Sequence, residues 1–318
     1  MVTRTQRSTP RILIGPSSFG VVDAAPLERL REAGFDVQQN PFGRKLTERE
    51  LIDLLPGVVG LIAGLEPLKG SVLERSELRA ISRSGAGMSN VDLDAARRLG
   101  IVVRNTPDAP TAAVAELTLA VMLALLRQIV SMNVDLHAGR WTRLVGAQIE
   151  GKTVAVIGFG RIGRRVATLL TAFGARVIAV DPHVSTVDPP IELASLTDAL
   201  PLANIVTLHA SGDTTILGTA ELLRLKPGAL VLNCGRGGLV DEEALCGALD
   251  SGHVAGAWID TFREEPYTGP LLRYPQALLT PHVGSLTVEC RRRMEMEAAE
   301  NLLEALGTAG AVKIEERR

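Results

Sequence analysis

Short apolar runs recur along the chain, separated by longer stretches in which apolar residues follow a helical period. The runs occupy residues 11–15, 58–64, 153–157, 177–181, 205–208, 229–233, 255–260 and 277–280. They do not alternate between polar and apolar residues, which is typical of strands buried on both faces of a parallel sheet. Strands that alternate with helices in this way predict βαβ units and an α/β fold.

One predicted helix, from about Thr111 to Leu136, is apolar on almost every face, and Glu116 is its only charge before Arg127. A helix without a polar face must be covered on all sides. A helix of about 25 residues is about 38 Å long, which is more than one small domain usually covers. We therefore expect either an interior helix or a helix buried between two subunits.

The length of 318 residues is typical of two domains. We predict a division near Pro107, with residues 1–107 in a smaller α/β unit and residues 108–286 in a second one. For the remaining residues, 287–318, the sequence predicts a charged helix over 291–306 followed by a polar end. We expect this tail to return to the first unit.

Composition excludes several classes of function. Lys and Arg number 34 and Asp and Glu number 36, giving a net charge of −2, and only 3% of the residues are aromatic. Without a basic stripe or a stacking surface, nucleic acid is not an expected partner. The longest uncharged apolar stretch, 117–126, is shorter than the roughly 20 residues that span a bilayer, so no membrane association is expected.

Cysteine usage and the N-terminus indicate a cytoplasmic protein. The three cysteines have no CxxC spacing, which argues against a disulfide framework and a structural zinc site and fits a reducing compartment. The first ten residues are polar and basic, with no apolar segment behind them, so no signal peptide is expected. No pair of histidines has the spacing of metal ligands, so we expect no metal.

A glycine-rich turn follows the apolar run 153–157 and reads Gly158, Phe159, Gly160, Arg161, Ile162, Gly163. Gly158 permits a tight turn from strand to helix, and Gly160 lets a pyrophosphate approach the backbone. Gly163 lets the following helix pack close to the sheet. We predict that helix over 161–173, with its N-terminal N–H groups available to phosphates.

The next predicted strand ends at Asp181, where a carboxylate can accept hydrogen bonds from the ribose diol of adenosine. Strand, loop, helix, strand and acidic residue therefore occur in the order of a dinucleotide-binding unit. A carboxylate at Asp181 also repels a 2′-phosphate, and Pro182 and His183 add no arginine or lysine. The sequence favours NAD over NADP as the cofactor.

Three further strand ends carry Arg236, Glu265 and His282. Each residue alone is more often an ordinary surface residue, but α/β proteins place ligands at the carboxyl ends of neighbouring parallel strands. Arg236 could hold a carboxylate through two hydrogen bonds. Glu265 could hold the imidazole of His282, which could then exchange a proton with a carbonyl or an alcohol.

Other residues flank the same strand ends. His209 is expected to line the cofactor cleft through its backbone, and Cys234 is interpreted as a small filler residue because no base for a nucleophilic cysteine is evident. With these two, the residues expected to contact the cofactor are Gly158, Gly160, Arg161, Ile162, Gly163, Asp181, His209, Cys234, Gly235 and Gly284, to which the family resemblance described next adds Asp260.

These residues together resemble the D-isomer-specific 2-hydroxyacid dehydrogenases, in the phosphoglycerate-dehydrogenase-like group. The resemblance covers nearly the whole chain, and its most specific segments are 83–92, 105–107, 113–116, 151–163, 233–245, 256–266 and 280–282. It implies a Rossmann-type doubly wound parallel sheet in an NAD-binding domain, residues 108–286. It also implies a smaller flavodoxin-like α/β substrate domain, residues 1–107 plus 287–318, and an active site in the cleft between the two domains.

The resemblance also implies an activity, namely hydride transfer between the nicotinamide and C2 of a D-2-hydroxy acid or 2-oxo acid, with phosphoglycerate-like acids among the candidate substrates. Arg236, Glu265 and His282 match the family's catalytic residues, and Asp260 matches an aspartate that usually holds the nicotinamide carboxamide. The partner is thus a small-molecule acid. Family members usually dimerise through their cofactor domains, which favours a homodimer and the intersubunit interpretation of the long helix.

On the substrate side, the resemblance assigns a loop whose backbone N–H groups bind the substrate carboxylate: Gly85, Ala86, Gly87 and Met88. Arg83 matches a phosphate-binding arginine of some members, although a structural ion pair is an equal alternative. Two departures stand out. Residues 210–213 replace the usual Pro-Leu-Thr pattern after His209, and Ser89 stands where many members have aspartate. No C-terminal regulatory domain is expected.

Two alternative functions remain open at this point. The same fold serves in corepressors that bind NADH and present a peptide groove, and such proteins can keep the arginine, glutamate and histidine. A related dehydrogenase of phosphite is the other alternative. A formate dehydrogenase is disfavoured, because those enzymes pair the histidine with glutamine where this chain has Glu265.

Overall fold

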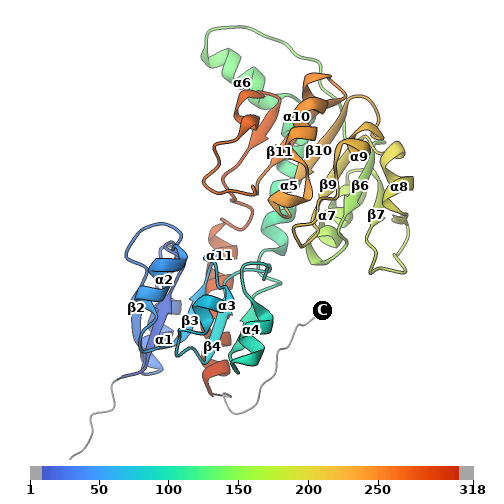
Figure 1. The fold of residues 1–318 in the computed structure, drawn as a ribbon. Coiled ribbons are helices and arrows are strands. Elements are labelled where there is room, and N and C mark those ends of the chain that lie inside the picture. Colours follow the sequence, from blue (N-terminus) through green and yellow to red (C-terminus); the bar gives the residue numbers. More distant parts are fainter. Residues whose placement is uncertain (1–8, 308–318) are drawn as a thin grey trace, which may run out of the picture. The chain divides into compact units, whose positions relative to one another are not determined.

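The computed structural model describes residues 9–307, which divide into two compact units (Figure 1). Unit 1 consists of the residues up to Pro110 together with those from Leu286 onward, and unit 2 is Thr111–Ser285. The polar N-terminal residues before position 9 and the polar end after position 307 lie outside the described residues.

Unit 1 is a five-stranded parallel sheet with helices packed on it (Figure 1). Its strands are β1 (Arg11–Ile14), β2 (Asp36–Gln39), β3 (Val58–Ala63), β4 (Ala80–Arg83) and β5 (Val102–Asn105), in the order β2-β1-β3-β4-β5. Its helices are α1 (Ala25–Glu32), α2 (Glu48–Leu54), α3 (Gly70–Leu73), α4 (Leu93–Arg98) and α11 (Val288–Gly307). The C-terminal helix α11 packs against β3, β4, β5 and α1.

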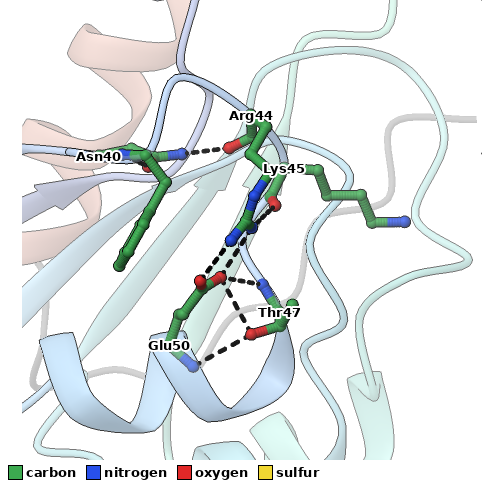
Figure 2. A network of polar contacts seen from close by, with 6 residues as sticks. Asn40, Arg44, Lys45, Thr47 and Glu50 are labelled. Atoms are coloured by element: carbon green, nitrogen blue, oxygen red, sulfur yellow. Dashed lines mark hydrogen bonds and ion pairs between the residues drawn. The ribbon is translucent and has the colours of Figure 1, made fainter. Parts of the chain in front are cut away.

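The strand order of unit 1 reverses between β1 and β3, and doubly wound sheets bind ligands at the carboxyl end of such a switch point. A polar network holds the loop after β2 at this edge (Figure 2). The Asn40 side-chain amide donates to the carbonyls of Gly15 and Arg44, at 2.7 Å each. Thr47 and Glu50 cap α2 reciprocally, and Glu50 also binds the guanidinium of Arg44.

Unit 2 is a seven-stranded parallel sheet in the order β12-β11-β10-β9-β6-β7-β8. Its strands are β6 (Thr153–Ile157), β7 (Arg176–Val180), β8 (Glu192–Leu193), β9 (Ile205–Leu208), β10 (Ala229–Asn233), β11 (Val254–Ile259) and β12 (Ala277–Leu279). Its helices are α5 (Thr111–Leu126), α6 (Ile129–His137), α7 (Arg161–Ala172), α8 (Leu196–Ala199), α9 (Thr219–Leu223) and α10 (Glu242–Asp250). Both faces of the sheet are covered by apolar clusters.

The predicted α/β fold with a Rossmann-type doubly wound sheet is confirmed. Each apolar run singled out in the sequence is a strand whose ends lie within one residue of the prediction. The runs are buried because helices lie on both faces of each sheet, which is why they lack a polar alternation.

The prediction of one continuous helix from Thr111 to Leu136 is wrong. The segment forms α5 and α6, which meet at an angle of 64°. Gln128 between them has φ 51° and ψ 36°, a left-handed conformation that ends α5. The carbonyl of Leu126 then accepts a hydrogen bond from the N–H of Ala147 at 2.8 Å instead of continuing the helix.

The two helices also differ in burial. Eight of the 16 residues of α5 are buried, and this helix packs against α7 and β11, whereas α6 buries none of its residues. The interior interpretation therefore fits the buried side of α5 and does not fit α6, and burial between two subunits stays a prediction. Within residues 9–307 no individual helix has the length and apolar character needed to cross a membrane, and α5 and α6 meet that criterion only as a bent pair.

Candidate active site

The candidate residues of unit 2 gather at the carboxyl edge of its sheet. Gly158 follows β6, Asp181 follows β7, His209 follows β9, Cys234, Gly235 and Arg236 follow β10, Asp260 follows β11, and His282 and Gly284 follow β12. Because all strands are parallel, these positions share one edge of the sheet. Glu265 lies in the segment that leaves β11.

The backbone of the glycine loop agrees with the role predicted for each of Gly158, Gly160 and Gly163. Gly158 has φ +86°, which L side chains rarely adopt. A Cβ on Gly163 would lie 2.0 Å from the carbonyl oxygen of Gly158, so only glycine lets α7 pack this close to β6. A Cβ on Gly160 would meet nothing within 4 Å, which leaves open space beside the backbone. The helix α7 begins there without a side-chain cap.

Asp181 is fixed by two backbone N–H groups. Its Oδ2 accepts from Phe159 at 2.7 Å and its Oδ1 accepts from His183 at 2.8 Å. A carboxylate oxygen has a second lone pair, so both oxygens can still accept from a ribose hydroxyl. The open backbone at Gly160, the uncapped start of α7 with Arg161 and Ile162 in its first turn, and this carboxylate fit a dinucleotide cofactor.

His282 and Glu265 form a hydrogen-bonded pair. Nδ1 of His282 lies 3.1 Å from both carboxylate oxygens of Glu265. The N–H of Phe262 donates to Oε1 of Glu265 at 3.1 Å and fixes that carboxylate. With Nδ1 held in this way, Nε2 is the nitrogen that can exchange a proton with a ligand.

Asp260 organises the turn that carries His282. Its Oδ1 accepts from the Thr280 hydroxyl at 2.6 Å and from the N–H of Val283 at 2.9 Å, and its Oδ2 accepts from the N–H of Gly284 at 3.0 Å. The backbone N–H of His282 donates to the carbonyl of Asp260 at 2.8 Å. These bonds support His282 at φ +54°, an uncommon conformation for a residue other than glycine. This positioning role was not predictable from the sequence, because the bonds form only when β11 and β12 lie side by side.

Arg236 is held close to the segment that carries Glu265. Its Nη1 donates to the carbonyl of Gly235 at 2.7 Å. A Cβ on Gly237 would lie 2.1 Å from the carbonyl carbon of Phe262, so glycine is needed for the two loops to approach. Burial lowers the pKa of Arg236, while the nearby carboxylates of Asp213 and Glu265 raise it. Asp213 belongs to the run that departs from the family pattern.

His209, after β9, and Cys234, after β10, form a buried neutral pair at the carboxyl edge of the unit 2 sheet. Nδ1 of His209 lies 3.2 Å from Sγ of Cys234, and Nε2 lies 2.9 Å from the Thr207 hydroxyl. Burial lowers the pKa of His209 to about 3 and raises the pKa of Cys234 to about 12. Neither group therefore changes its proton near neutral pH, which argues against an acid, base or nucleophile at these positions.

In unit 1, the loop 85–88 is held by its first residue and its carbonyls. The N–H of Gly85 donates to the Thr106 hydroxyl at 2.7 Å, and the carbonyl of Ala86 accepts from the Asn105 side chain at 2.8 Å. Among residues 9–307, the N–H groups of Ala86, Gly87 and Met88 donate to no acceptor. Three of the four predicted backbone donors are thus available to a ligand, and the fourth serves the fold.

Arg83, at the end of β4, is 7% exposed and donates from Nη1 to the carbonyl of Ser84 at 2.8 Å. No group of three or more His, Cys, Asp or Glu side chains within the described part of the chain is arranged to hold a metal ion.

The chain is similar to known proteins over most of its length. A sequence model of the family described as D-isomer specific 2-hydroxyacid dehydrogenase, NAD binding domain, matches residues 119–284. D-3-phosphoglycerate dehydrogenase of Mycobacterium leprae (strain TN) is 41% identical over 239 residues, which cover 72% of this chain and 45% of that protein. Hydroxypyruvate reductase of Thermotoga maritima is 35% identical over 273 residues, which cover 82% of this chain and 89% of that protein.

Among solved structures, a glyoxylate reductase from Paecilomyes thermophila matches with a TM-score of 0.85 at 27% identity, covering 98% of this chain and 99% of that one. The chain spans less than half the length of the mycobacterial relative. These findings confirm the resemblance inferred from the sequence. The names of the three relatives specify different acids, so the comparisons leave the substrate open.

Proposed function

Because the chain belongs to the D-isomer-specific 2-hydroxyacid dehydrogenase family, we propose that it reduces a small 2-oxo acid at C2, or oxidises the matching D-2-hydroxy acid, with NAD as its cofactor. The observation that carries this proposal is the hydrogen-bonded pair of His282 and Glu265, with Arg236 next to Glu265. The three lie at the same sheet edge as the glycine loop.

The residues have distinct roles in this reaction. A nicotinamide cofactor supplies the hydride when it is bound. The guanidinium of Arg236 binds the substrate carboxylate and polarises the carbonyl oxygen. His282 donates a proton to that oxygen, and Glu265 stabilises the imidazolium through Nδ1. In the oxidative direction, His282 takes the proton back.

Unit 1 supplies a second group of donors. We assign to the N–H groups of Ala86, Gly87 and Met88 the binding of a substrate carboxylate, since each lacks an acceptor within residues 9–307. We assign to Asp260 a contact with the nicotinamide carboxamide, in addition to its hold on the turn 280–284.

We infer that NADH is preferred over NADPH. Asp181 is fixed by two N–H groups and presents a negative charge where a 2′-phosphate would lie. Three free thiols among the described residues fit a reducing compartment, and we place the protein in the cytoplasm.

We also propose a homodimer that forms through unit 2. Exposed apolar side chains gather on α6 and the segment after it, where Trp141 is 81% exposed and Val145 is 93% exposed. Light scattering should give a dimer for the wild type and a monomer for Val145→Asp. Leu223→Asp, a matched change at an exposed leucine of α9, should leave the dimer intact. A monomeric wild type would contradict this proposal.

The decisive experiment is NADH oxidation by the purified protein with a panel of 2-oxo acids. The panel comprises glyoxylate, pyruvate, hydroxypyruvate, phosphohydroxypyruvate, and branched and aromatic 2-oxo acids. We expect turnover with at least one of them and little turnover when NADPH replaces NADH. Tight NADH binding without any turnover would favour an NADH-binding regulator. Absence of NADH binding would contradict the assignment of Gly158 to Asp181 as a cofactor site.

A further inference from the structure

A buried carboxylate lies at the carboxyl edge of the unit 1 sheet. Glu66 follows β3 and is 1% exposed, and its Oε1 accepts from the N–H of Gly64 at 2.8 Å. A Cβ on Gly15, which follows β1, would lie 1.9 Å from the same oxygen. Gly15 has no positive φ, and the carboxylate of Glu66 fills the space that a side chain at this position would take. Glu66 therefore occupies the switch point between β1 and β3.

Burial raises the pKa of Glu66, and two positive charges oppose this shift. They belong to Arg83, at the end of the neighbouring strand β4, and to Lys45, in the loop after β2. Figure 2 shows the side chain of Lys45 extending away from the pair of Arg44 and Glu50. Arg83 is the buried member of the two: it is 7% exposed, so water has little access to its charge.

The turn that carries Glu66 is attached to the far end of the loop 85–88. The side-chain amide of Asn90 donates to the carbonyls of Gly64 at 3.0 Å and of Glu66 at 2.8 Å. At the near end, Nη1 of Arg83 occupies the space that a Cβ on Gly85 would need, only 1.5 Å from that position. Glu66 and Arg83 thus adjoin opposite ends of the loop that presents three N–H groups to a ligand.

This arrangement sets the charge that a ligand meets. Three backbone N–H groups suffice for one carboxylate. More positive charge beside them would favour a second negative charge on the ligand, and the carboxylate of Glu66 reduces the positive charge that Arg83 brings there. Charges at partly buried sites change affinities by about 10-fold or more at distances of several ångströms.

We propose that Glu66 is a specificity-determining residue: by balancing the charge of Arg83 beside the loop 85–88, it favours 2-oxo acids with one negative charge over dicarboxylic or phosphorylated ones. The inference rests on the proposed function, in which this loop binds the substrate carboxylate. It assigns Arg83 to charge balance within the fold rather than to binding of a phosphate.

Oxamate and oxalate test the proposal, because they have nearly the same shape but carry one and two negative charges. Their Kd values are measured by calorimetry on the NADH complex. Glu66→Gln keeps an oxygen that can accept from Gly64 and removes the charge. We expect it to shift the ratio of the two Kd values toward oxalate by about 10-fold. Glu77→Gln is the matched control: this exposed carboxylate binds the N–H of Gly57 before β3, at the amino edge of the sheet, and the ratio should stay unchanged.

An unchanged ratio in folded Glu66→Gln overturns the proposal, and so does a failure of the wild-type NADH complex to bind either ligand. Both results are distinct from failure of the proposed function, which is decided by turnover on the panel of 2-oxo acids. If Glu66→Gln shifts the ratio of the two Kd values but the wild type turns over none of the 2-oxo acids, the role of Glu66 in selecting ligand charge is supported and the proposed reaction is contradicted.

Discussion

Nδ1 of His282 lies 3.1 Å from both carboxylate oxygens of Glu265, although the two residues follow different strands. The bond fixes which nitrogen of the imidazole faces the carboxylate, and leaves the other for proton exchange. The left-handed backbone of His282 is supported by the hydrogen bonds of Asp260, so this conformation depends on the neighbouring strand. The pair is therefore a product of the parallel sheet and not of either loop alone.

His282→Ala should lower kcat by roughly 10² to 10⁴, because the protonation of the carbonyl oxygen loses its donor. Affinity for NADH should change by less than about twofold, since the imidazole serves the chemical step. Steady-state kinetics on the best 2-oxo acid and a direct titration with NADH measure the two quantities. His137→Ala, at an exposed histidine of α6, is the control and should retain full activity. Near-full turnover in His282→Ala would remove His282 from this role.

The glycine loop offers a matched pair of substitutions. Gly160→Ala adds a methyl group into open space, so the protein should stay as stable as the wild type. The same methyl lies where the pyrophosphate must approach, and we expect the affinity for NADH to fall at least about 10-fold. Gly163→Ala should instead destabilise unit 2, because its Cβ would lie 2.0 Å from the carbonyl oxygen of Gly158.

Thermal unfolding without cofactor and NADH titration separate the two effects. Gly247→Ala, in α10 and also free of neighbours, controls for the added methyl. Unchanged NADH binding in Gly160→Ala would show that the pyrophosphate of the cofactor does not lie against the backbone of Gly160.

Asp181→Ser should reduce the preference for NADH over NADPH by about 10-fold or more, since the charge that repels a 2′-phosphate is gone. The serine hydroxyl can replace only part of the hold on Phe159 and His183, so some loss of NADH affinity is expected as well. The ratio of kcat/KM for the two cofactors is the measurement. Asp188→Asn, in the same exposed segment after β7, should leave that ratio unchanged. An unaltered ratio in Asp181→Ser would place the discrimination elsewhere.

Buried strands were predictable from the sequence because a strand that is covered on both faces consists almost entirely of apolar residues. Residues 229–233 are all apolar up to the terminal asparagine, and helices cover both of their faces. Strand β2, with the sequence Asp36-Val-Gln-Gln39, lies at the edge of the unit 1 sheet and is partly exposed, so polar residues suffice and the run carries no apolar signal. Composition likewise could not show that α5 ends at Leu126, because the break depends on the backbone of Gln128 and on Ala147.

The residues of the candidate site also divide into those that the sequence could predict and those that it could not. Residues that meet a ligand, such as Arg236 and His282, are chemically distinctive and stand out beside strand ends. Residues that act through other residues do not. The role of Glu66 depends on Gly15, Gly64 and Arg83, which come together only when three strands are aligned. No local spacing in the sequence could express that contact.

Asp260→Asn tests whether the turn after β12 depends on a carboxylate. The amide keeps one acceptor oxygen but presents a donor where an oxygen accepted from Val283 or Gly284, so one buried hydrogen bond is lost and two donors face each other. The free energy of unfolding of unit 2 should fall by about 1–3 kcal/mol. Urea unfolding followed by tryptophan fluorescence measures this, since both tryptophans of the chain, Trp141 and Trp258, belong to unit 2.

The same substitution should lower kcat, because His282 loses the support that holds its backbone in place. Asp250→Asn, at an exposed carboxylate that accepts from the Tyr274 hydroxyl, is the control and should change the stability by less than about 0.5 kcal/mol. If Asp260→Asn leaves both stability and kcat at wild-type values, the carboxylate does not position His282. If stability falls while kcat is kept, Asp260 supports the fold and His282 is held by Glu265 alone.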